Sequence, residues 1–327
     1  MKIKIMWMEW ERNGENMNKL KNSELNNYFM TPTVMSNGLI LYPVNIYDYD
    51  YFKQLAMNYI VLDVESRNNM QRQEFITNRK KGLIPRTEKY KKFRFINLFD
   101  FLVASINQDE KIGEVKNNPS DVAKMKEIYK DEEQVINFLQ LAELSQYQNL
   151  LGNVLELFHM VTNIVPTYSN NEFIFNIDGN ELKIDRENFY EFRQIIMNQN
   201  LLFEPRIAPD PESQKEIDRE LKSKNGDEEF DLEATICFVS VNLGGIDIGN
   251  YTYYRLMCDY AMLLKDKGYN STSVYRANGC KMEGDKDIPY PNMSERLSIK
   301  DNPYSKDKLY RSSQLTEFDK KLMKNSK

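Results

Sequence analysis

The order of apolar and polar residues predicts helices along most of the chain. Apolar residues recur at three- and four-residue steps, the spacing of one helical face, in several regions. These regions are residues 51–62, 125–161, 189–196, 232–243 and 253–264. Residues 93–106 are apolar at most positions and predict a buried helix, whereas the highly charged residues 64–92 predict an exposed helix that ends before Pro85.

Capping residues mark where several of these helices begin and end. A side-chain oxygen before the first turn and proline at the first helical position are typical of helix starts, and glycine is typical of helix ends. The predicted starts are Asp48 or Asp50, Asp210-Pro211, and Asn250 or Thr252, and the predicted ends are Gly244-Gly245 and Gly268. Residues 111–118 are the clearest predicted loop.

The apolar period changes to two in one internal region. Residues 172–177 and 181–184 alternate as strands do, and Asp178-Gly179 between them is a preferred hairpin turn. Residues 38–42 form a second short apolar run, which Pro43 ends. The predicted fold class is therefore α+β and mainly α-helical, with helical lobes, a short β-hairpin near residues 172–184 and a small N-terminal strand element.

Length and local polarity suggest how the chain is divided. A chain of 327 residues corresponds to about two domains of roughly 150 residues each. The polar, asparagine-rich residues 1–30 predict a flexible N-terminal arm. We expect an N-terminal lobe over residues 31–118, a helical C-terminal domain with the hairpin over residues 119–278, and an extended tail over residues 279–327.

The composition is that of a water-soluble globular protein, with 41% hydrophobic and 28% charged residues. No run approaches the roughly 18 consecutive apolar residues of a membrane span, and no signal peptide opens the chain, so we expect no membrane partner. The three cysteines, Cys237, Cys258 and Cys280, contain no CxxC pair and suggest reduced thiols in a cytoplasmic compartment. Cys237 and Cys258 lie in apolar helical patterns and are predicted to be small core residues.

The charge balance argues against general binding of duplex DNA. The chain has 44 Lys and Arg residues against 49 Asp and Glu residues, a net charge of −5, whereas such binding depends on a basic footprint. Two basic runs exist, Arg79-Lys80-Lys81 and the set Lys89, Lys91, Lys92 and Arg94. We interpret both as solvated faces rather than as a binding patch.

Catalytic signals are weak. The single histidine, His159, lies on a predicted helix between Phe158 and Met160, and the sequence contains no HExxH motif, no Cys/His cluster and no phosphate-binding glycine loop. Asp178, Glu181 and Lys183 resemble the acidic and lysine residues of some Mg²⁺-dependent nucleases, but Asp178 is explained as part of the hairpin turn. We predict a chain that is not an enzyme and needs no cofactor or metal.

Aromatic residues favour either an interface or half-buried packing. They make up 12% of the chain, and tyrosine is the commonest of them at 20 residues. Tyrosine combines apolar area with a polar tip and is enriched at protein interfaces. Three clusters stand out, namely residues 42–52, 189–192 and 251–254.

One family resemblance rests on residues 184–200 (IDRENFYEFRQIIMNQN), the Asp210-Pro211 helix start, residues 238–241 (FVSV) and residues 250–256 (NYTYYRL). Together with Thr31-Pro32 and residues 38–43 (GLILYP), these stretches resemble tail-morphogenesis proteins of phages of low-G+C Gram-positive bacteria. Such proteins are usually described as tail assembly chaperones or tail proteins.

The resemblance implies a non-enzymatic role in phage tail assembly through protein–protein contact. The partner would be the tape-measure protein or another tail or baseplate subunit, and the location would be the host cytoplasm or the virion tail. The positions that would bind the partner are Tyr190, Arg193, Gln199, Asn200, Tyr253, Tyr254 and Arg255. A structural tail or baseplate component, an inhibitor of a host defence enzyme and a Mg²⁺ nuclease remain as alternatives, and the sequence leaves the oligomeric state open.

Overall fold

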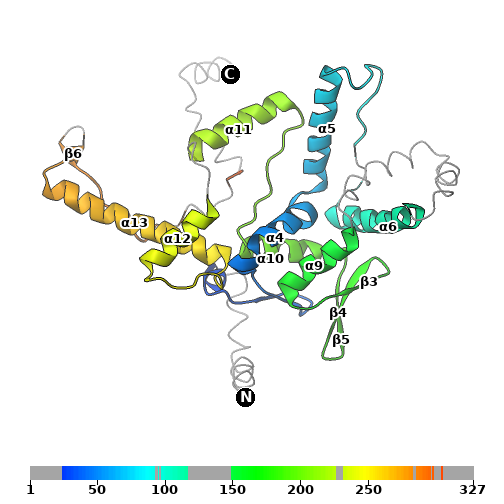
Figure 1. Cartoon of the computed structure of the whole chain (residues 1–327), viewed down its shortest axis with the longest axis horizontal. Helices are drawn as coiled ribbons and strands as arrows, with labels where there is room; N and C mark the ends of the chain where they lie inside the picture. The colour runs from blue at the N-terminus through cyan, green and yellow to red at the C-terminus, as the bar shows by residue number, and fades with distance from the viewer. Residues whose placement is uncertain are drawn as a thin grey trace, which may run out of the picture. The chain divides into compact units, whose positions relative to one another are not determined.

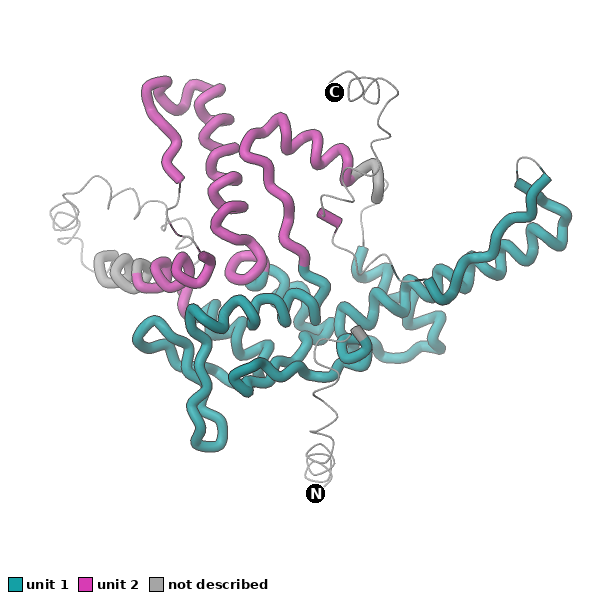
Figure 2. Tube along the Cα trace, turned by 180° about the vertical axis from the view of Figure 1, so that it is seen from behind, with its two compact units in different colours: residues 1–56, 152–202, 231–300 teal, residues 57–151, 203–230, 301–327 magenta. Residues whose placement is uncertain are grey.

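The computed structural model of the chain describes residues 24–92, 95, 97–116, 149–225, 231–282, 285–295, 297, 303 and 304 (Figure 1). Most of the predicted N-terminal arm, the helical pattern over residues 125–148 and the last part of the predicted tail lie outside these residues. The chain divides into two compact units, each made from three separate segments (Figure 2). Unit 1 comprises residues 1–56, 152–202 and 231–300, and unit 2 comprises residues 57–151, 203–230 and 301–327. The domain boundaries expected from the sequence stay a prediction.

Unit 1 combines helices with small antiparallel sheets. Its helices are α3 (Glu24–Tyr28), α4 (Ile46–Ala56), α9 (Leu150–Thr162, from Gly152 onward), α10 (Phe189–Gln199), α12 (Leu232–Asn242) and α13 (Tyr253–Ala277). Its strands are β1 (Thr33–Val34), β2 (Ile40–Leu41), β3 (Thr167–Ser169), β4 (Glu172–Ile177), β5 (Asn180–Ile184), β6 (Lys281–Met282) and β7 (Lys286–Asp287). The strands pair as β1–β2, β3–β4–β5 and β6–β7. The predicted class, α+β and mainly helical, is confirmed.

The predicted hairpin forms at the expected turn. Ile177 pairs with Asn180, so the loop consists of Asp178 and Gly179 alone. Both residues have positive φ, 50° and 83°, as a two-residue turn of the type favoured by Asp-Gly requires. Phe173 and Phe175 on one face of β4 are fully buried, which fixes the register of the hairpin against the core.

The aromatic core of unit 1 is centred on Phe158 of α9. Its ring centroid lies 4.6 Å from that of Phe173, 5.7 Å from Phe175 and 4.8 Å from Phe192 of α10. All four side chains are at most 1% exposed. The sheet and the two helices are therefore joined through one cluster of rings.

Unit 2 contains a π-helical turn, η1 (Met57–Val61), and the helices α5 (Val64–Lys80), α6 (Leu98–Lys116) and α11 (Pro211–Asn225). The predicted start of α11 is confirmed, because the Asp210 carboxylate accepts hydrogen bonds from the backbone N–H groups of Glu212 and Ser213. Bonds from the Ser213 N–H and hydroxyl lower the pKa of Asp210. No helix in the described part of the chain is long and apolar enough to cross a membrane.

Several local predictions are wrong. Residues 111–116 continue α6 rather than forming a loop, and α4 begins at Ile46, so that Asp48 and Asp50 lie inside the helix instead of capping it. Cys237 is exposed rather than part of the core, whereas Cys258 is buried as expected.

Gly268 does not end its helix, because α13 runs on to Ala277. A Cβ at this position would lie 3.3 Å from Cγ of Pro291. The chain after β7 returns along α13 here, since the Tyr269 and Tyr290 rings stack at 4.5 Å and the Lys265 ammonium donates to the Asn292 carbonyl. Glycine at this position therefore permits a close contact of the returning chain with α13.

Candidate protein-docking surface

The four partner-binding positions predicted on and after α10 fall into two groups. Tyr190 is 67% exposed and is accessible to a partner. Arg193, Gln199 and Asn200 are buried. The helix therefore presents one of the four side chains to solvent and directs three into unit 1.

Gln199 and Asn200 hold the N-terminal strands against α10. The Gln199 amide donates to the Thr33 hydroxyl (2.9 Å) and the Leu41 carbonyl (3.1 Å). The Asn200 side chain accepts from the Val44 N–H (3.0 Å) and donates to the Ile196 carbonyl (2.9 Å). The Asn200 side chain thereby supplies the acceptor that the buried Val44 N–H requires.

The predicted positions at the start of α13 also lie within side-chain networks. The Tyr253 ring stacks on Tyr49 at 4.2 Å, and burial raises the pKa of Tyr253 to about 12. Tyr254 is buried. The Arg255 guanidinium lies over the Tyr251 ring at 4.1 Å and forms an ion pair with Asp259 at 3.7 Å, so this segment is held mainly by internal contacts.

The nuclease hypothesis gains no support from the hairpin. Asp178 occupies the turn, Glu181 pairs with Asn176, and the Lys183 ammonium forms an ion pair with Glu172 at 2.8 Å. Among the described residues no three His, Cys, Asp or Glu side chains gather as metal ligands would. Lys183 is thus engaged by a carboxylate outside the proposed trio.

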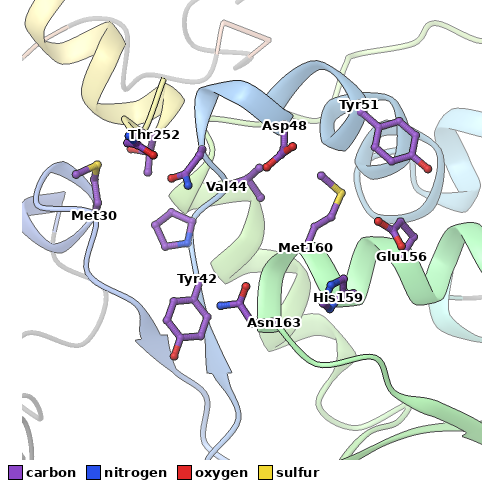
Figure 3. Close-up of a pocket in the computed structure, with 13 residues that line it drawn as sticks. Met30, Tyr42, Val44, Asp48, Tyr51, Glu156, His159, Met160, Asn163 and Thr252 are labelled. Carbon is purple, nitrogen blue, oxygen red and sulfur yellow. The ribbon is translucent and has the colours of Figure 1, made fainter. Parts of the chain in front are cut away.

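A polar cavity of about 460 Å³ lies in unit 1 beside His159 (Figure 3). Asp48 and Tyr51 of α4 line it together with Glu156 and His159 of α9. Nδ1 of His159 is buried without a hydrogen-bond partner in the described part of the chain. A catalytic histidine is normally oriented by a second group within hydrogen-bonding distance, and the described residues place no such group at Nδ1.

The most unusual surface belongs to α12. Its inner face packs on α13 around Val239, Ile248 and Leu256. Its outer face consists of Ala234, Cys237 and Val241, and all three are exposed. We call these three residues, with Ile246 that follows the helix, the docking face.

The docking face is apolar although it faces solvent. Val241 is 75% exposed and Ile246 is 46% exposed, and Glu233 is the only charged residue of α12. A helix that is apolar on all sides is normally buried. None of these residues is among the binding positions predicted from the sequence, although a helix of eleven residues with apolar groups on both faces was a visible signal.

In comparison with known proteins, no family model, no curated protein and no solved structure matches the chain.

Proposed function

We propose that the chain is a non-catalytic protein-binding factor of phage tail morphogenesis, and that the docking face of α12 is where its partner binds. The observation that carries the proposal is the exposed apolar outer face of this helix. Apolar patches of a few hundred Å² rimmed by polar residues commonly mark protein–protein contacts. The resemblance to tail-morphogenesis proteins supplies the biological setting.

The chemistry of the face favours a helical partner. Ala234, Cys237 and Val241 follow one another at steps of three and four residues, which is the spacing of a helix–helix seam. Small side chains at the first two positions allow a second helix to approach closely. The proposed partner is therefore an amphipathic helix, and the tape-measure protein is the one that the resemblance implies.

The neighbouring helix α13 also has exposed apolar side chains. Exposed apolar side chains of α13 are Met262, Leu264, Val274 and Tyr275. Tyr190 lies outside this surface and remains a separate predicted contact.

Co-expression with the proposed partner, a phage tape-measure protein, tests the proposal. Val241→Glu places a charge at the centre of the face, and we expect the captured partner to fall at least tenfold, since burying an unpaired carboxylate is costly. Val165→Glu is the matched control, because Val165 is an exposed valine of unit 1 (61%) outside α12 and α13. Equal capture by both variants would contradict the proposal.

A transient chaperone and a permanent tail component differ in whether this contact persists. Mass spectrometry of purified particles separates them. The chaperone form of the proposal predicts the chain in infected-cell lysate and not in particles, whereas abundant peptides from particles would establish a structural subunit.

A further inference from the structure

The two basic runs of the sequence lie along α5, the first at its C-terminal end and the second beside its first turns. After Gly82 the chain turns back along the helix that it has just left (Figure 1). The Tyr90 hydroxyl donates to the Asn68 carbonyl at 2.6 Å, and the rings of Tyr90 and Phe75 lie 5.8 Å apart. An Arg79 N–H donates to the Arg86 carbonyl. Residues 86–92 are therefore held against α5, which ends in residues 79–81, within unit 2.

This structure carries a dense positive charge. Its exposed cations, which we call the basic strip, are Arg79, Lys81, Arg86, Lys89 and Lys92. Glu88 is the only carboxylate between residues 79 and 92. Lys80 is excluded because it forms an ion pair with Glu212 at 3.1 Å, and Arg94 lies outside the described residues.

We propose that the basic strip binds the phosphate backbone of duplex nucleic acid. Tyr90 contacts Asn68, and Lys80 lies twelve positions after Asn68 in α5. The strip is therefore about 18 Å long at 1.5 Å per residue. Duplex DNA presents about one negative charge per 1.7 Å of axis. Five cations along such a length match this polymer better than the mixed charges of an acidic protein surface.

The residues of the strip favour contact with a phosphate backbone over stacking on bases or anchoring in an anionic membrane. Tyr90 packs on Phe75 and is half-buried, so it does not offer a ring for base stacking. Leu83, at 71%, is the one large apolar side chain of the described residues 79–92 that is strongly exposed. A single such side chain offers little apolar surface for anchoring in a bilayer. The net charge of −5 argues against binding over the whole surface and would confine a polyanion to this strip.

Fluorescence anisotropy with a short duplex DNA of random sequence tests the inference at several salt concentrations. A protein that neutralises about five phosphates gives a slope of log K against log salt near −4.5, and its affinity falls several-hundred-fold between about 50 and 200 mM salt. We expect the full-length chain to show this salt dependence and to bind duplexes of different sequence equally well.

Two variants with equal charge loss make the test specific. The strip variant carries Lys81→Gln, Arg86→Gln, Lys89→Gln and Lys92→Gln. The control carries Lys53→Gln, Lys267→Gln, Lys281→Gln and Lys286→Gln, all at exposed positions of unit 1. The strip variant should lose most of the slope, at about one unit per removed contact, while the control keeps it and both retain the wild-type circular dichroism.

Three results would overturn the inference. They are the absence of binding at low salt, equal slopes for the two variants, and binding of phosphatidylserine vesicles or an acidic polypeptide in place of the duplex. A triple variant with Lys81→Arg, Lys89→Arg and Lys92→Arg should bind like the wild type, and failure to do so would also count against a phosphate contact. This test does not depend on the docking face, so either proposal can fail alone.

Discussion

Replacing Phe158 with alanine is expected to lower the free energy of unfolding by about 3–5 kcal/mol, the usual cost of a large-to-small change at a buried aromatic position. The Phe158 side chain is 1% exposed and touches the rings of Phe173, Phe175 and Phe192. Its loss removes contacts with the sheet and with α10 at once. The loss of stability should lie near the upper end of this range if β4 and β5 cannot move into the cavity that the Phe158 ring leaves.

Denaturant unfolding followed by far-ultraviolet circular dichroism measures this effect. Phe158→Leu should cost clearly less, because it retains most of the volume. Tyr190→Ala is the exposed control on α10 (67% exposed) and should change the free energy of unfolding by less than about 0.5 kcal/mol. A Phe158→Ala chain as stable as the Tyr190→Ala chain would refute the assigned core.

Asn200→Ala is expected to destabilise the chain by about 2–3 kcal/mol, because it leaves a buried N–H group without an acceptor. The group is the backbone N–H of Val44, which donates to the Asn200 side chain, and Asn200 itself is 0% exposed. The change should loosen the segment between β2 and α4. Asn200→Asp keeps an acceptor but buries a carboxylate, and should be at least as harmful.

The outcome distinguishes a structural role from the partner contact that the resemblance implied. If Asn200 binds a partner directly, Asn200→Ala will reduce capture of the partner while the unfolding midpoint stays unchanged. If Asn200 supports the fold, the midpoint falls, and hydrogen exchange at the Val44 amide becomes faster.

Local signals predicted those parts of the fold that depend on neighbouring residues. The Asp178-Gly179 turn, the Asp210 cap and the Thr252 cap of α13 each need only a few residues to form, and all three are observed. Alternation of apolar residues likewise located β4 and β5. These features are determined by chain geometry over short distances.

Features that depend on distant contacts were not predictable in the same way. Gly268 resembles a helix stop until Pro291, 23 residues later, is found against it. Gln199 and Asn200 resemble polar surface residues until Thr33, Leu41 and Val44 provide their partners. Because the Gln199 and Asn200 contacts join segments more than 150 residues apart, and the Gly268 contact joins residues 23 apart, no local pattern reveals them.

The docking face likewise depends partly on local sequence and partly on contacts with distant residues. The sequence places Ala234, Cys237 and Val241 on one face of an apolar helix, but both faces of α12 are apolar and the pattern does not say which one is buried. The contact of Val239 with Leu256 and Ile248 decides it. The basic strip likewise exists only because Tyr90 returns to Asn68.

Cysteine footprinting of the purified chain with and without the tape-measure protein tests the docking face most directly. Cys237 lies on the face, exposed Cys280 lies beyond the end of α13 as an internal reference, and Cys258 is buried. A maleimide should label Cys237 and Cys280 in the free chain, and binding should protect Cys237 while Cys280 remains reactive. Undiminished labelling of Cys237 in the saturated complex, or no complex at all, would contradict the proposal that α12 docks the partner.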